Sequence, residues 1–155
     1  METKKNTFMP DAIKSLEIRV VTANVQIKCS EDTLIHVEAE SLQEMDYVCE
    51  VRNQKLVVLY GVEGKKHLIN FNWKEAQIVL CFPKGKIFEH VALEIGAGNI
   101  DMKEVPVLCN EMEAEIGAGK WRAAGLQVSG RLDLQVGAGR DVEFQLCHPL
   151  KGQRA

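Results

Sequence analysis

Paired carboxylates recur in the second half of the chain, and such pairs are the groups that hydrolyse glycosidic bonds. Glu94 is followed by Glu115, and Glu113 by Asp133, at nearly constant spacing. Glycoside hydrolysis needs two carboxyl groups placed across the scissile bond. Strands stacked in a coil lie about 4.8 Å apart, however, so any repeat brings like residues together without forming a catalytic site. The short turns between repeats also leave little chain for a substrate cleft. We therefore expect no enzyme, and a carbohydrate-active one is the less favoured alternative.

Glycine motifs that bind phosphates are incomplete in this sequence. Residues 61–66 read Gly-Val-Glu-Gly-Lys-Lys, which lacks both the spacing of a phosphate loop and its Ser or Thr. Gly-Ala-Gly triplets occur at 96–98, 117–119 and 137–139, but none continues into the dinucleotide-binding pattern followed by a helix. The sequence therefore predicts no nucleotide cofactor.

Cysteine and histidine are not spaced as ligands or catalytic pairs. The five cysteines include no CxxC pair, and an odd number argues against a disulfide framework or a zinc site. Most of them lie in apolar runs, where we expect small buried residues. No two histidines have the close spacing of a local metal pair. Cys147 and His148 are adjacent, so they would point to opposite faces of a strand. We expect no catalytic, cofactor-binding or metal-binding residue.

The elements that carry these residues are strands, because apolar and polar residues alternate along most of the chain. Alternating or β-rich runs predict strands at residues 16–20, 25–27, 34–39, 47–51, 56–60 and 74–82. Residues 52–55 read as a hairpin turn, 61–73 as a loop and 83–86 as a turn. Helical periodicity is nearly absent, which indicates an all-β protein.

The triplets mark a repeat. Units at about 91–102, 112–123 and 132–144 each consist of a strand, Gly-Ala-Gly and a second strand, with about 20–21 residues per coil. One unit cannot bury its apolar row alone, whereas stacked units can. The pattern predicts a β-solenoid within a single domain of residues 1–155, with 147–155 as a tail or cap. We expect the glycines to form corners, Trp121 to lie in the core, and Ala118 to point inward, so that Ala118→Leu would overpack its coil.

Outward positions beside the triplets form the candidate interaction surface. An acidic stripe containing Glu94 and Glu115 is expected to lie beside a more basic one containing Lys120 and Arg140. A solvated face held by cross-strand charge pairs explains the same pattern. A groove for a polar partner or a cation is the alternative.

Composition excludes several partners. The 155 residues carry a formal net charge of −3, without the basic patch that nucleic-acid binding needs. No apolar segment follows Lys4 and Lys5, which argues against a signal peptide. The longest apolar runs are far shorter than a membrane span, so direct membrane insertion is not expected. These features fit a cytoplasmic chain as written, although they do not fix its location.

The chain resembles the bacterial putative-adhesin domain family, whose function is unknown. The likeness rests on Ile13–Ile18 with Ala23–Ile27, on Ile78–Gly85, and on the three strand, Gly-x-Gly, strand units. It implies a solenoid similar to a single-stranded right-handed β-helix, and a non-catalytic module often attached to bacterial envelopes. The expected partner is a protein or glycan, with self-association through the solenoid ends as a further expectation. A regulatory partner domain in envelope-stress signalling is the alternative function.

Overall fold

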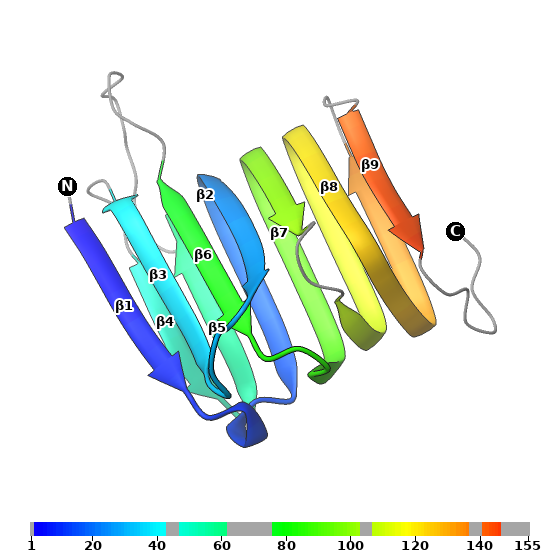
Figure 1. Cartoon of the computed structure of the whole chain (residues 1–155). Helices are drawn as coiled ribbons and strands as arrows, with labels where there is room; N and C mark the ends of the chain where they lie inside the picture. Colours follow the sequence, from blue (N-terminus) through cyan, green and yellow to red (C-terminus); the bar gives the residue numbers. More distant parts are fainter. Residues whose placement is uncertain (1, 43–46, 62–75, 103–106, 137–140, 147–155) are drawn as a thin grey trace.

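The computed structural model describes residues 2–42, 47–61, 76–102, 107–136 and 141–146, and these form an all-β structure, as predicted. A single 3-10 turn, η1 (Pro10–Ala12), interrupts the strands. Nine strands stack from one end of the molecule to the other (Figure 1): β1 (Glu2–Phe8), β2 (Ser15–Cys29), β3 (Ile35–Leu42), β4 (Tyr47–Arg52), β5 (Lys55–Tyr60), β6 (Gln77–Phe82), β7 (Ile87–Met102), β8 (Leu108–Val136) and β9 (Asp141–Leu146).

Long strands that turn a corner give the stack its solenoid form. Residues 15–20 of β2 pair with β5, whereas residues 24–29 pair with β6, both in parallel. β7 then runs parallel to β2 across both segments, and β8 runs parallel to β7. We call the segments before the corner the first arm (15–20, 87–95, 108–116 and 127–136). Those after it are the second arm (24–29, 99–102, 120–126 and β9).

The N-terminal end of the stack is antiparallel, which the repeat does not predict. β4 pairs with β5 through the predicted hairpin turn, where Asn53 and Gln54 have φ of 52° and 65°. Two successive residues with positive φ are typical of the tight turn that matches strand twist. β3 pairs with β6, and β1 with β3, both antiparallel. The sequence did not reveal β1 because its residues are mostly polar.

Ladders of apolar residues fill the space between the arms. Val91, Leu93 and Ile95 pair in register with Met112, Ala114 and Ile116, and all six are at most 4% exposed. The constant offset between these partners is the predicted 21-residue repeat. Trp121 pairs with Ile100 on one side and Val142 on the other, and it is 1% exposed. The predicted stacking and the core position of Trp121 are therefore confirmed.

The corner is built by the glycines, as predicted, but the alanines do not point inward. Gly98 and Gly119 have φ of 146° and 147°, and a Cβ on Gly119 would lie 1.6 Å from the Gly98 carbonyl oxygen. Ala97 and Ala118 are exposed, so the expectation that Ala118 packs between layers is wrong. The close approach between coils occurs at the flanking glycines, and the alanine side chain turns to solvent. The third triplet, the predicted tail and most of the predicted 61–73 loop lie outside the described residues.

Candidate interaction surface

The outward side of the first arm carries a set of stacked carboxylates. Glu94 of β7 lies directly across from Glu115 of β8, and Ala92 lies across from Glu113. All three glutamates are exposed. We call Glu94, Glu113 and Glu115 the acidic face. Like charges directly opposite each other on neighbouring strands are destabilising, so this arrangement opposes folding unless a cation compensates it.

Among the described residues, Arg19 of β2 compensates the acidic face at the edge formed by Glu94. The Arg19 Nε donates to Glu94 Oε1 at 3.0 Å, and both side chains are about half-exposed. Such an exposed pair contributes roughly 0.2–1 kcal/mol to stability. Among the described residues, no cation lies within ion-pair distance of Glu115. Uncompensated negative charge therefore remains toward the C-terminal end of the face.

Further charges border the acidic face on the same side as Arg19 and near the start of β7. Lys55 Nζ lies 2.9 Å from Glu17 Oε1, beside Arg19. His90 Nδ1 lies 3.4 Å from Glu111 Oε1, and its Nε2 lies 3.9 Å from Glu113 Oε2. The acidic face is thus bounded by cations from the preceding coil and by one histidine.

An open depression of about 350 Å³ runs over the acidic face. Its lining includes all three glutamates of the face together with Arg19, His90 and Asp133. The depression is shallow and polar, and its walls come from consecutive coils. It suits a surface contact better than an enclosed small molecule, since small-molecule sites are concave and mostly apolar.

Lys120 lies around the corner from the acidic face, on the second arm. A polar ladder precedes it: Asn99 Nδ2 donates to Asn24 Oδ1 at 2.9 Å, and the Lys120 backbone N–H donates to Asn99 Oδ1 at 3.2 Å. The next residue in this column is Asp141, because β8 and β9 pair with an offset of 21. The place of Lys120 in a basic stripe with Arg140 stays a prediction. Arg140 itself lies outside the described residues.

The carboxylate pairs lie in the open rather than in an enclosed site. Glu94 and Glu115 lie on adjacent coils, but both are exposed and Glu94 is held by Arg19. Enzymes raise the pKa of a catalytic carboxylic acid by enclosing it in apolar surroundings, which this surface does not provide. Within the described ranges, no three His, Cys, Asp or Glu residues are arranged to hold a metal ion.

The cysteines are less buried than expected. Cys109 is buried, and burial raises the pKa of its thiol to about 12. Cys49 and Cys81 are partly buried, and Cys29, at the end of β2, is exposed. Among the four described cysteines, the expectation of full burial therefore holds for Cys109 alone. The other three lie at strand ends or outward positions, which leave the thiol near solvent.

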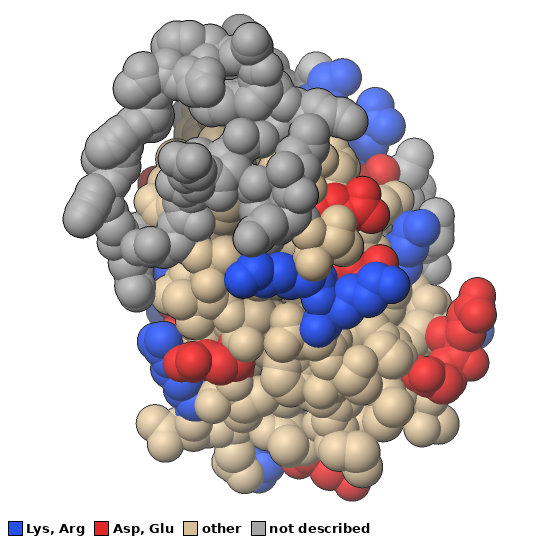
Figure 2. Space-filling view, turned by 90° about the vertical axis from the view of Figure 1, so that its left-hand side faces the viewer, with Lys and Arg blue, Asp and Glu red and all other residues tan. Residues whose placement is uncertain are grey.

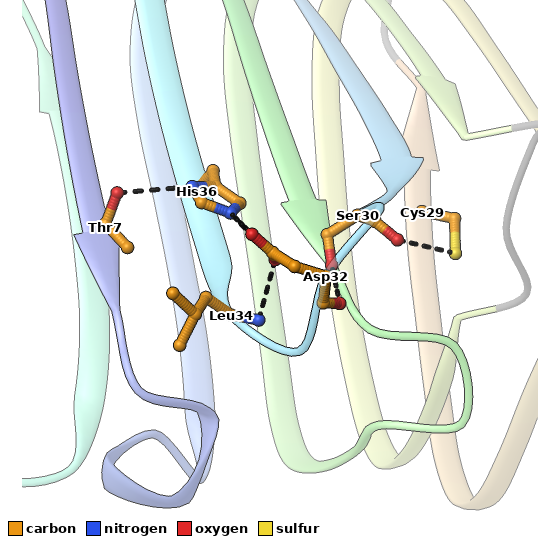
Figure 3. A network of polar contacts seen from close by, with 6 residues as sticks. All are labelled: Thr7, Cys29, Ser30, Asp32, Leu34 and His36. Carbon is orange, nitrogen blue, oxygen red and sulfur yellow. Dashed lines mark hydrogen bonds and ion pairs between the residues drawn. The ribbon is translucent and has the colours of Figure 1, made fainter.

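One polar network was not predicted from the sequence. His36 of β3 bridges Thr7 of β1 and Asp32 of the preceding turn (Figure 3): its Nδ1 lies 3.2 Å from Thr7 Oγ1 and its Nε2 lies 3.0 Å from Asp32 Oδ1. Asp32 Oδ1 also accepts the Leu34 N–H at 2.9 Å. These contacts tie the edge strand β1 to the stack. Nothing in the spacing of the three residues signals that β1 exists, so the network could not be foreseen.

A family model for the Toastrack DUF4097 domain matches residues 13–145. The chain belongs to this family. The Toastrack match covers β2 to β9 nearly completely, and so includes the acidic face and both glycine corners. No protein of curated function matches the chain.

A solved structure has a similar fold at low sequence identity. A putative cell adhesion protein from Clostridium sporogenes ATCC 15579 is 11% identical, with a TM-score of 0.59, over 93% of this chain and 100% of that one. A putative adhesin from Parabacteroides distasonis ATCC 8503 is 9% identical, with a TM-score of 0.37, over 92% of this chain and 69% of that one. The first likeness supports the fold alone, and the second is too low to support an argument.

Within the residues that the structure describes, no helix has the length and hydropathy to cross a bilayer.

Proposed function

We propose that this chain is a non-enzymatic interaction module of the bacterial cell envelope. Its acidic face, in this proposal, binds a protein partner that presents lysine or arginine side chains. The observation that carries the proposal is the direct opposition of Glu94 and Glu115 on neighbouring coils. Of this pair, Glu94 has a cationic neighbour among the described residues, Arg19, and Glu115 has none. A cation from a partner would relieve the repulsion that remains.

The shape of the surface supports the same proposal. The depression over the acidic face is open and spans several coils. Charge complementarity over such a surface steers association and selects partners more than it adds affinity. The name of the solved structure with a similar fold, a putative cell adhesion protein, agrees with an interaction role.

The test is binding of a lysine-rich peptide to the immobilised intact chain at low and physiological salt. We expect binding that weakens with salt, because exposed charges are screened, and that falls about tenfold in Glu94→Gln/Glu115→Gln. Glu31→Gln/Glu40→Gln is the matched control, since both residues are exposed and lie away from the acidic face. Equal loss in both double variants contradicts a localised site. Turnover of a polysaccharide that disappears in Glu115→Gln contradicts the non-enzymatic role.

A further inference from the structure

The last coil of the first arm presents an open strand edge. Residues 127–136 of β8 lie on the preceding coil, where the Gln127 N–H donates to the Val107 carbonyl at 2.9 Å and the Ser129 hydroxyl donates to Asn110 Oδ1 at 2.5 Å. Among the described strands, none pairs with the other side of this segment. An open edge of backbone N–H and C=O groups is a template for another strand.

The apolar row of this coil is incompletely covered. Leu132 and Leu134 pack against the core but stay only partly buried. The corresponding residues of the inner coils are at most 4% exposed: Val91, Leu93, Met112 and Ala114. Within the described part of the chain, the inner coils have a layer on each side, whereas the last coil has a layer on one side. A further layer would complete the burial of both leucines.

We infer that a second copy of this chain supplies that layer through a two-fold axis at Leu132. In an antiparallel pair centred on Leu132, Arg131 lies across from the partner's Asp133, and Asp133 lies across from the partner's Arg131. Each contact therefore occurs twice. Opposite charges directly across an antiparallel pair stabilise it.

The charges of Arg131 and Asp133, and the alternation of inward and outward residues along the strand, select the pairing centred on Leu132. Arg131 is 71% exposed and Asp133 is 46% exposed, and their closest charged atoms within one chain are 3.9 Å apart, at the limit of an ion pair. Centring the axis on Leu132 also keeps inward residues opposite inward ones, since Gly130 meets the partner's Leu134. Centring on Asp133 would place two carboxylates face to face. A centre between Leu132 and either of its neighbours would set leucine against a charged residue.

The other end of the stack does not offer an equivalent surface. Figure 2 looks at the β1 end, where Lys and Arg side chains cross the middle of the face. Lys4 and Lys5 of β1 are exposed, and the Lys4 Nζ lies 6.0 Å from the centroid of the Tyr47 ring. Lysines on an edge strand disfavour pairing with another strand. Head-to-tail stacking, with the last coil of one copy on β1 of the next, is therefore disfavoured. The geometry that remains is a closed, isologous dimer, in which both copies use the same surface. A two-fold axis normal to the arms also brings β9 beside the partner's β9.

The experiment is sedimentation velocity over a range of concentrations, with circular dichroism to verify folding. We expect the wild-type chain to reach twice its 17.3 kDa mass as concentration rises. Arg131→Asp, and separately Asp133→Arg, should each weaken dimerisation about tenfold, because each places two like-charge pairs across the axis. The exchange Arg131→Asp/Asp133→Arg should restore the dimer, since it restores both pairs. Both residues face solvent, so folding should be preserved.

Lys5→Glu is the control, because it changes an exposed charge at the opposite end. It should leave the dimer unchanged. A wild-type chain that stays monomeric at the highest soluble concentration overturns the proposal. So does a dimer that the exchange variant fails to restore, or an assembly that Lys5→Glu disrupts, since the latter indicates head-to-tail stacking. These outcomes do not depend on which partner the acidic face binds.

Discussion

Replacing Gly119 with alanine tests the corner most severely. The new Cβ would lie 1.6 Å from the Gly98 carbonyl oxygen and 2.7 Å from its carbonyl carbon, and neither backbone atom can move without displacing a coil. A non-glycine residue held at a rare positive φ costs about 1–3 kcal/mol, and overpacking costs a similar amount. We therefore expect Gly119→Ala to lower the free energy of unfolding by about 4 kcal/mol.

Three further variants separate the causes. Gly85 has φ of 87°, and a Cβ added there would have nothing within 4 Å, so Gly85→Ala introduces backbone strain alone, about 1 kcal/mol. Gly117 has no positive φ, but its Cβ would lie 2.5 Å from the Gly96 carbonyl oxygen, so Gly117→Ala introduces the close contact alone, about 2 kcal/mol. Ala118→Leu changes an exposed side chain and should stay within about 0.5 kcal/mol.

Thermal and urea unfolding measure these differences. At roughly 2–4 °C per kcal/mol for a domain of this size, Gly119→Ala should lower Tm by about 8–16 °C. The loss in the free energy of unfolding should be largest for Gly119→Ala, smaller for Gly117→Ala and smaller again for Gly85→Ala. Ala118→Leu should stay near wild type. If Gly119→Ala were no worse than Gly85→Ala, the close approach between coils would not limit the corner. If Ala118→Leu were as damaging as Gly117→Ala, the alanine would face the core after all.

Two further predictions concern titratable groups. The Leu34 N–H, and then His36, hold the pKa of Asp32 below its usual value, so the charged carboxylate stabilises the fold above about pH 4 and this contribution is lost as pH falls through the lowered pKa. Asp32→Asn should therefore be less stable than wild type in urea melts at pH 7 and equal to it near pH 2; an equal deficit at both pH values would refute this. Iodoacetamide at pH 8 should modify exposed Cys29 before Cys109, whose buried thiol has a pKa of about 12. Mass spectrometry of the peptides checks the order, and equal rates would contradict the burial of Cys109.

The repeat predicted the second half of the fold because one pattern fixes both register and burial there. Aligning the triplets at Gly96 and Gly117 already sets Glu94 across from Glu115, as the structure confirms. One coil earlier, the register that pairs Ala23 with Gly98 also places Arg19 across from Glu94.

Other features depend on contacts that the sequence does not display. The direction of the Ala118 side chain follows from the backbone geometry of the neighbouring glycines, which the spacing alone leaves open. The pairing of Lys120 with Asp141 follows an offset of 21, whereas the second and third triplets are 20 residues apart in the sequence. β1 is recognisable only from its pairing with β3, since its polar residues carry no β-periodicity.

The most direct test of the acidic face as a binding surface is a chemical-shift titration of the isotope-labelled chain with a lysine-rich peptide. Backbone amides of residues 92–94 and 113–115 should shift together and saturably, while those of Asn24, Asn99 and Lys120 around the corner should not. Loss of these shifts in Glu94→Gln/Glu115→Gln, with retention in Glu31→Gln/Glu40→Gln, is the predicted result. Shifts centred on the second arm, or spread evenly over all exposed carboxylates, would contradict a binding role for the acidic face.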